Sequence, residues 1–302
     1  MTVFESARRA AAEIATLSVE HINGVLLHTA DCIMASVDEL LSANAEDVAA
    51  MSPENPMVDR LRLTPERIAA ICDDMRRVAE LPSPVGEVME QWTRPNGMTI
   101  TQQRVPLGVV GVIYEARPNV TFDVFSLCLK TANACILKGG SDAYRTNLAA
   151  IAIIRRSLEE CGVTVDAAVL LGCDRACTEQ LLKAVGMVDV VIPRGSTSLI
   201  RYVRENAQVP VIETGAGVVH TYFDREGDVT VASDIVTNAK TRRVSVCNAL
   251  DCLVVHRDRL TDLPVVCARL AESRVVIYAD AEAYAALSGR YPSELLLPAA
   301  EQ

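Results

Sequence analysis

Apolar positions in the first 80 residues recur at intervals of three and four, which is the spacing of an amphipathic helix. Ile22, Leu26 and Leu27 begin one such row. Farther along, Thr64 and Pro65 combine a capping side chain with a proline at the first helical position. The pattern therefore predicts a helical N-terminal region whose apolar faces pack on a sheet.

Between about residues 91 and 105 the pattern changes to polar positions that alternate with apolar ones, which is typical of an exposed strand pair. Asn96-Gly97 in the middle of this stretch predicts a two-residue hairpin turn. Such an arm either contacts a partner subunit or caps the sheet, and the stretch by itself favours neither interpretation.

From residue 105 onward, short apolar runs alternate with helical stretches. Strands and helices that alternate at this spacing predict an α/β fold with a parallel, doubly wound sheet. The predicted strands cover residues 109–114, 134–137, 169–171, 188–192, 209–212, 253–256 and 275–278.

Three of the turns that follow these strands carry Gly, Ser, Thr or Lys, and they contain Lys138-Gly139, Gly195-Ser196 and Glu213-Thr214-Gly215. Glycine lets a phosphate approach the backbone, and a helix N-terminus supplies N–H groups and positive potential. None of these turns has the spacing of the GxGxxG fingerprint. Three such turns at one sheet edge nevertheless favour a nucleotide cofactor cleft over simple connections.

Charge and cysteine usage exclude several classes of protein. The net charge of −10 over 302 residues argues against a general nucleic-acid binder, and no apolar run is long enough for a membrane span. The ten cysteines and four histidines show no metal-ligand spacing, so we expect no metal site and no histidine cluster. Free thiols and the lack of a signal-peptide pattern indicate a cytoplasmic protein.

Cys247 stands apart from the other cysteines because it follows Lys240, Arg242 and Arg243. A thiol attacks carbon as the thiolate, and neighbouring cations favour that form. The alternative is a buried structural cysteine beside a solvated basic turn.

Residues 105–121, which read VPLGVVGVIYEARPNVT, resemble the signature segment of the γ-glutamyl phosphate reductases. These are the glutamate-5-semialdehyde dehydrogenases of proline biosynthesis, a branch of the aldehyde dehydrogenase superfamily. The resemblance extends over nearly the whole chain and includes the Cys247 stretch. It implies an NADP-binding domain at 1–238 with a protruding arm at about 91–105, and the N-terminal part of a catalytic domain at 239–302.

The resemblance also implies roles for individual residues. Cys247 matches the nucleophile, and Asn119 matches the amide that stabilises charge on the substrate carbonyl oxygen. The cofactor-binding positions implied are Lys138, Gly139, Ser141, Arg194, Gly195, Ser196, Glu213, Thr214 and Gly215. Ser141 stands where relatives that prefer NAD have a glutamate, so we expect NADP(H). Candidate ligands of the substrate's phosphate and carboxylate are Arg117, Lys240, Arg242 and Arg243.

The implied reaction is the NADPH-dependent reduction of L-γ-glutamyl 5-phosphate to L-glutamate 5-semialdehyde and phosphate. The resemblance further implies a homo-oligomer, a dimer or tetramer built through the arm, and functional coupling to glutamate 5-kinase. The sequence departs from the family pattern at Gly217-Val218, Val244 and Asp251.

Two alternatives to this reductase stay open. One is an aldehyde dehydrogenase or acyl-CoA reductase with another substrate. The other is a truncated paralogue without full activity that acts as a binding or assembly partner, because family members continue for roughly a hundred residues beyond Gln302, about the size of a further half-domain.

Overall fold

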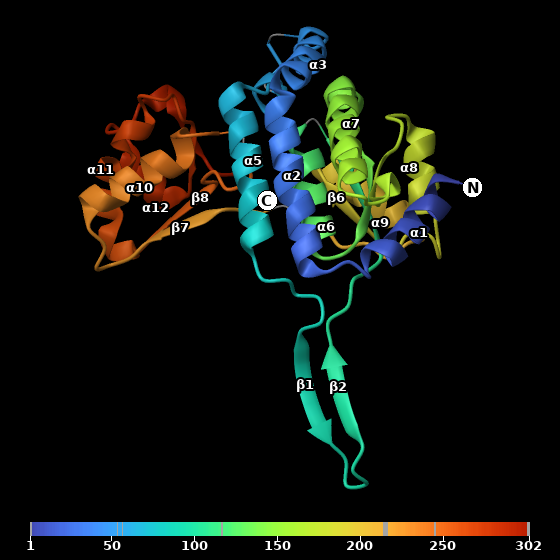
Figure 1. The fold of residues 1–302 in the computed structure, drawn as a ribbon. Coiled ribbons are helices and arrows are strands. Elements are labelled where there is room, and N and C mark those ends of the chain that lie inside the picture. The colour runs from blue at the N-terminus through green and yellow to red at the C-terminus, as the bar shows by residue number, and fades with distance from the viewer. Residues whose placement is uncertain are drawn as a thin grey trace. The chain divides into compact units, whose positions relative to one another are not determined.

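The computed structural model describes residues 2–52, 54–55, 57–115, 117–213, 217–244 and 246–300. The chain divides into two compact units, Met1–Thr214 and Gly215–Gln302 (Figure 1). The boundary therefore falls earlier than the expected division after residue 238. The physical reason is that helix α10 (Val229–Thr241) buries Val236 in the core of the second unit. The assignment of cofactor and catalytic roles to the two parts stays a prediction.

A four-stranded parallel sheet forms the centre of the first unit, with strand order β5-β4-β3-β6. Every residue of β3 and β4 is buried, as expected for strands covered on both faces. Val211 adds one parallel bridge to Val191 of β6, so the strand predicted at 209–212 is reduced to a single bridge. The bounds are β3 Val109–Tyr114, β4 Ala134–Lys138, β5 Ala168–Leu170 and β6 Val190–Arg194.

Helices on both sides of this sheet confirm the doubly wound α/β arrangement (Figure 1). Helices α6 (Asn119–Lys130) and α7 (Tyr144–Glu160) connect β3 to β4 and β4 to β5. Helices α8 (Arg175–Leu182) and α9 (Thr197–Asn206) precede and follow β6. Leu181 of α8 packs directly on Gly111 of β3, where a Cβ atom would lie 2.9 Å from the leucine Cδ1.

The predicted helical N-terminal region is confirmed. Thr64 caps α5, because its hydroxyl accepts a hydrogen bond from the Arg67 N–H at 3.2 Å. Helices α2 and α5 pack on each other and on α6, and α2 also contacts α7. They therefore add a further layer outside α6 and α7. The bounds are α1 Val3–Ile14, α2 Val19–Ala35, α3 Val37–Ala49, α4 Val58–Leu61 and α5 Pro65–Glu80.

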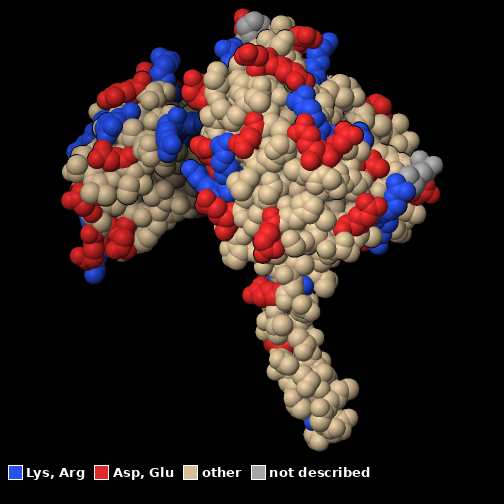
Figure 2. Space-filling view, viewed as in Figure 1, with Lys and Arg blue, Asp and Glu red and all other residues tan. Residues whose placement is uncertain are grey.

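The predicted arm is an antiparallel hairpin of β1 (Val88–Thr93) and β2 (Thr99–Gln103) that projects from the first unit (Figure 1). Its turn differs from the two-residue prediction. Beyond the Thr93–Thr99 pair, the Arg94 N–H donates to the Met98 carbonyl at 2.8 Å, which leaves residues 95–97 as the loop. Pro95 lacks an N–H and cannot extend the strand pairing, which accounts for the longer loop. Figure 2 shows that most of the visible surface of this arm is uncharged.

The second unit contains two separate two-stranded parallel sheets. In the first, β7 (His220–Phe223) pairs with β8 (Cys252–Val255), and α10 connects them. In the second, β9 (Ile277–Ala279) pairs with β10 (Leu296–Pro298), and α12 (Ala281–Leu287) connects them. Helix α11 (Leu263–Cys267) packs on α10 and α12. The sequence pattern indicated β8 and β9 but missed β7 and β10.

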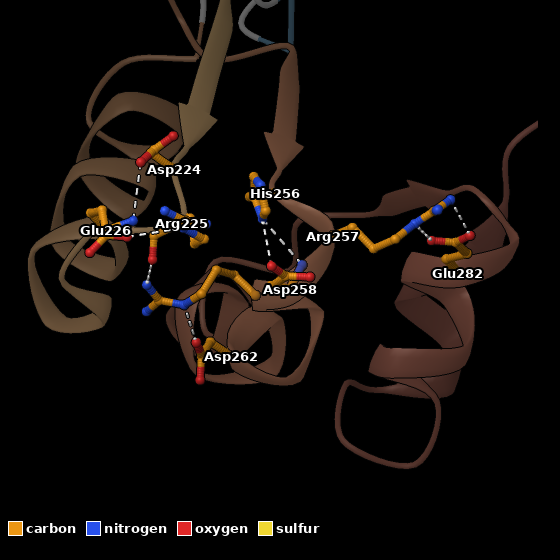
Figure 3. Close-up of polar contacts among 9 residues, drawn as sticks. Asp224, Arg225, Glu226, His256, Arg257, Asp258, Asp262 and Glu282 are labelled. Atoms are coloured by element: carbon orange, nitrogen blue, oxygen red, sulfur yellow. Dashed lines mark hydrogen bonds and ion pairs between the residues drawn. The ribbon is translucent and has the colours of Figure 1, made fainter.

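Arg259 anchors the segment that follows β8. Its guanidinium donates to Asp262 at 2.6 Å and to the main-chain carbonyl of Gly227 at 2.9 Å, and it lies 4.7 Å above the Phe223 ring. The neighbouring Arg257 reaches outward to Glu282 instead (Figure 3). Arg259 therefore ties the loop before α10 to the segment after β8.

All ten cysteines are free thiols in the structure. No helix in the described part of the chain combines the length and apolar character that crossing a bilayer requires. The expectation that no histidine joins a ligand cluster is wrong, because His28, Cys32 and Glu160 bring their donor atoms within 4.8 Å of one another.

Candidate active site

The first unit brings its predicted cofactor residues to a point where the strand order changes direction. From β3 the chain proceeds to β4 and β5 on one side, and then returns to β6 on the other side of β3. In parallel sheets, ligands bind outside the carboxyl ends of the strands at such a point. Glu115 follows β3 there, and its N–H donates to the carbonyl of Arg194, the last residue of β6, at 3.3 Å.

Ser196 lies at the N-terminus of α9 and already holds an anion. Its N–H donates to Glu115 Oε2 at 2.8 Å, and its hydroxyl donates to Glu115 Oε1 at 2.8 Å. The carboxylate thus marks a pair of donors that a phosphate group could also use, assisted by the helix dipole. Glu115 is not among the residues predicted from the sequence, although an acidic residue directly after a buried strand was a usable signal.

Gly195 and Gly139 provide close approach to the backbone at two of the predicted positions. A Cβ atom at Gly195 would lie 2.6 Å from Glu115 Oε2 and 2.8 Å from Leu199 Cδ2. A Cβ atom at Gly139 would lie 2.4 Å from Asn147 Nδ2. Both positions therefore exclude any larger residue unless neighbouring groups move.

Lys138 is the last residue of β4 and is 8% exposed. Its ammonium donates to the carbonyl of Cys173 at 2.9 Å, and burial lowers the pKa of Lys138 from its ordinary value. Ser141 follows closely and begins the short 3₁₀ turn that leads into α7. Lys138 thus has one fixed partner and two donor hydrogens left for ribose oxygens.

Asn119 is the first residue of α6, and its side-chain amide donates to Asp123 Oδ2 at 2.9 Å. Burial raises the pKa of Asp123, while the Asn119 hydrogen bond opposes that shift. The second amide hydrogen of Asn119 is then available for a carbonyl oxygen. Arg117 lies two residues earlier, and its carbonyl accepts from the N–H of Val120 at 3.0 Å.

Glu213 lies after the Val211 bridge and forms an ion pair with Arg204 at 3.3 Å. Its other carboxylate oxygen, Oε2, is buried without a hydrogen-bond partner among the described residues. A buried, unsatisfied carboxylate oxygen is unusual away from functional sites. The predicted cofactor residues Thr214 and Gly215 lie outside the described part of the chain.

Cys247 lies in the second unit, in the turn between α10 and β8, and it is exposed. The other nine cysteines are buried or half-buried, so the interpretation of Cys247 as a buried structural thiol is excluded. Lys240 is in the last turn of α10 and donates to the carbonyl of Leu250 at 2.8 Å. Arg242 and Arg243 follow on the surface of the same unit.

Within the first unit the structure therefore brings Glu115, Arg194, Gly195 and Ser196 together. Lys138 and Asn119 lie at the carboxyl ends of β4 and β3 of the same sheet, where Asn119 begins the helix after β3. Within the second unit it places the exposed thiol on the turn that follows the predicted cationic residues. The first unit thus provides anion donors and a buried lysine, and the second unit provides an accessible nucleophile.

Comparisons with known proteins agree with this description. The model of the aldehyde dehydrogenase family matches residues 2–277. The γ-glutamyl phosphate reductase of Parabacteroides distasonis is 56% identical over 299 residues, which cover 99% of this chain and 72% of the relative. The enzyme of that name from Bacteroides thetaiotaomicron is also 56% identical, over 98% of this chain and 71% of its own length.

Among solved structures, γ-glutamyl phosphate reductase from Thermotoga maritima superposes with a TM-score of 0.88 at 33% identity. The superposition covers 99% of this chain and 72% of that one. The chain therefore belongs to the aldehyde dehydrogenase family, in the branch of the γ-glutamyl phosphate reductases.

Proposed function

We propose that this protein catalyses the NADPH-dependent reduction of L-γ-glutamyl 5-phosphate to L-glutamate 5-semialdehyde and phosphate, the second step of proline biosynthesis. The observation that carries the proposal is the 56% identity to a γ-glutamyl phosphate reductase across 99% of the chain. Aldehyde dehydrogenases described with other substrates match at 15–16% identity, which indicates a common fold and nothing more specific. No observation favours a role as an inactive assembly partner.

The cofactor would occupy the carboxyl edge of the sheet in the first unit. Gly195 and Ser196 would hold its pyrophosphate, and Lys138 would donate to a ribose. The support is physical: the Ser196 donors already bind a carboxylate, and Gly195 leaves room for a close approach. Ser141, rather than an acidic residue, follows Lys138 at the position expected near the 2′-oxygen, and this favours NADP(H) over NAD(H).

The chemistry would proceed through Cys247. Its thiolate attacks the carbonyl carbon of the acyl phosphate, the bond from carbon to the phosphate oxygen breaks, and phosphate leaves with the electron pair. The result is a thioester on Cys247. NADPH, held by Lys138, Gly195 and Ser196, would supply the hydride for this thioester. Cys247 would then leave as the thiolate when the carbon–sulfur bond breaks and the aldehyde is released.

Asn119 would stabilise the negative charge that develops on the carbonyl oxygen in both steps. Its amide already makes one hydrogen bond, to Asp123, which fixes the orientation of the second N–H. Arg117, Arg242 and Arg243 would bind the phosphate and the glutamyl carboxylate. Lys240 would join them, because its ammonium gives one hydrogen to the Leu250 carbonyl and keeps two for an anion.

The proposal is tested by replacing Cys247 with serine. Cys247→Ser should abolish NADPH oxidation with γ-glutamyl phosphate, while the dissociation constant for NADPH stays within about twofold, because serine fills the same volume but is a far weaker nucleophile. Cys252→Ser, a half-buried thiol of β8, is the matched control and should retain activity. Turnover by Cys247→Ser at the parental rate would exclude the thiol mechanism.

We also propose that the hairpin arm joins copies of the chain into a dimer or tetramer. All residues of β1 are exposed, and Trp92 and Met89 are 42% and 48% exposed. Apolar side chains on an arm with two open strand edges suit strand addition by a partner. Met89→Glu with Trp92→Glu should shift the mass measured by light scattering toward a single chain; an unchanged mass would contradict this role.

Placement in the reducing cytoplasm is supported by the ten free thiols. Functional coupling to glutamate 5-kinase stays a prediction.

A further inference from the structure

A cluster of donor atoms lies on the first unit away from the predicted cofactor residues. His28 and Cys32 are four residues apart on α2, so both side chains lie on one face of that helix. Glu160 is the last residue of α7, the neighbouring helix. The His28 Nε2, the Cys32 Sγ and a Glu160 carboxylate oxygen lie within 4.8 Å of one another, the one such group among the described residues.

The geometry does not suit a reactive thiol. Glu160 Oε2 lies 2.7 Å from His28 Nε2, and Cys32 Sγ lies 3.5 Å from the same nitrogen. A thiol–histidine–carboxylate relay needs the acid and the thiol on opposite ring nitrogens. Burial and the Glu160 carboxylate also raise the pKa of Cys32, which disfavours a free thiolate.

The same distances suit a tetrahedral metal ion. Zinc bonds of about 2.3 Å to sulfur and 2.0–2.1 Å to nitrogen or oxygen place two ligand atoms roughly 3.4–3.6 Å apart. The distances from Cys32 Sγ to His28 Nε2 and to Glu160 Oε2 are 3.5 and 3.7 Å. His28 Nε2 and Glu160 Oε2 are 2.7 Å apart, and this distance would have to increase by less than about 1 Å for both atoms to bind the ion.

The scaffold beneath the cluster is buried and hydrogen-bonded. Thr29 and Ser157, one residue from His28 and three from Glu160, are fully buried and share a hydrogen bond of 2.7 Å between their hydroxyls. This contact fixes the register of α2 against α7 and so holds the donors near each other before any ion arrives.

The electrostatics favour a divalent cation. A thiolate, a carboxylate and a neutral imidazole together offset a charge of +2, and the C-terminus of α7 adds a negative dipole end. Arg156 is the nearby opposing charge, and its guanidinium is held by the Ser36 hydroxyl at 2.9 Å. His28 and Glu160 side chains are 41% and 49% exposed, so an ion can enter from solvent.

We propose that His28, Cys32 and Glu160 form a binding site for zinc or a similar divalent cation that ties α2 to the end of α7. A mixed nitrogen, sulfur and oxygen donor set selects borderline metals such as Zn²⁺ and Co²⁺ over Mg²⁺ or Ca²⁺. The site is separate from the proposed reaction and uses none of its residues.

Cobalt titration of the metal-free protein tests this directly, in a Cys247→Ser background so that the exposed thiol cannot contribute. One equivalent of Co²⁺ should produce a thiolate-to-cobalt charge-transfer band. In Cys32→Ser the band should be lost, because no thiolate remains in the donor set. The dissociation constant for Co²⁺, measured by calorimetry, should rise by at least about tenfold, since even outer-shell changes cost 10–100-fold. Cys177→Ser, another half-buried thiol beside a carboxylate, is the matched control and should leave the band unchanged.

A second readout separates binding from misfolding. Excess Zn²⁺ should raise the melting temperature of the parent, because a ligand that binds the folded state stabilises it, but not that of His28→Gln. The proposal is overturned if no cobalt band forms, if Cys32→Ser keeps the parental affinity, or if zinc stabilises His28→Gln as much as the parent.

Discussion

The two units are built from the same strand–helix–strand elements but differ in how their sheets are completed. In the first unit the central strands β3 and β4 are buried at every position. In the second unit β8 is half-exposed, and its sheet is separated from the β9–β10 sheet by a cavity of about 640 Å³. Residues of β8 and β9 line that cavity.

This difference matches the two kinds of chemistry proposed. A parallel sheet whose central strands are covered on both faces fixes Glu115, Gly195 and Ser196 at one edge, where a cofactor needs donors that are already in place. The second unit presents Cys247 on an exposed turn, where a thiol can reach a substrate. Four substitutions test this difference between the units.

The largest of these effects should be the loss of turnover when the Asn119 amide of the first unit is removed. Asn119→Ala should lower kcat by about 10²–10³-fold, because the amide that stabilises the carbonyl oxygen is lost. Steady-state NADPH oxidation measures it. Asn206→Ala, an exposed asparagine at the end of α9, should change kcat by less than about twofold; equal losses in both variants would refute the assigned role.

Cofactor binding should be the next most sensitive property. Gly195→Val should weaken NADPH binding by at least about tenfold, because its side chain would overlap Glu115 and Leu199. Gly24→Ala is the control, since a Cβ atom there meets nothing within 4 Å. Fluorescence titration with NADPH distinguishes the two, and parental affinity in Gly195→Val would place the cofactor elsewhere.

A smaller effect is expected on the stability of the second unit. Arg259→Met should lower the free energy of unfolding by about 2–3 kcal/mol, because two or more hydrogen bonds to buried or partly buried groups are lost. Arg257→Met removes an exposed pair with Glu282 and should cost less than about 1 kcal/mol. Urea unfolding measures the free energy of unfolding of both variants. Equal losses in Arg259→Met and Arg257→Met would contradict the role of Arg259 as an anchor.

The smallest effect concerns Asp123. Burial raises its pKa, so the folded state binds the proton more tightly than the unfolded state, and stability declines as the pH rises above the ordinary range of an aspartic acid. Asp123→Asn should therefore melt at a slightly higher temperature than the parent at pH 7. The gap should narrow as the pH falls toward 4, and a gap that widens in acid would contradict the assignment.

Strongly buried elements could be predicted from the sequence, and the structure confirms them. Strand β3 has the predicted bounds because all six of its residues are buried, so its apolar run stands out. Strands β7 and β10 are short and mix exposed with buried positions, which leaves no clear pattern. The hairpin loop was predicted too short because Asn96-Gly97 was weighed without Pro95.

In the candidate site, too, some features could be predicted from the sequence and others could not. Residues in turns after strands, such as Lys138 and Ser196, could be located because the topology of a parallel sheet brings those turns to one edge. The contact of Glu115 with Ser196 and that of His28 with Glu160 join residues 81 and 132 positions apart. The first joins two turns after strands, for which an acidic residue directly after β3 was a usable signal. The second depends on how α2 packs on α7, and a single sequence carries no signal for it.

The most direct test of the central claim is to supply L-glutamate 5-semialdehyde and NADP⁺ without phosphate. The thiohemiacetal on Cys247 can then lose a hydride to form the thioester, but phosphate is absent and cannot release it. We expect a burst of one NADPH per active site and a glutamyl adduct on the peptide that contains Cys247. An adduct on another residue, or phosphate-dependent turnover with no adduct at all, would contradict it.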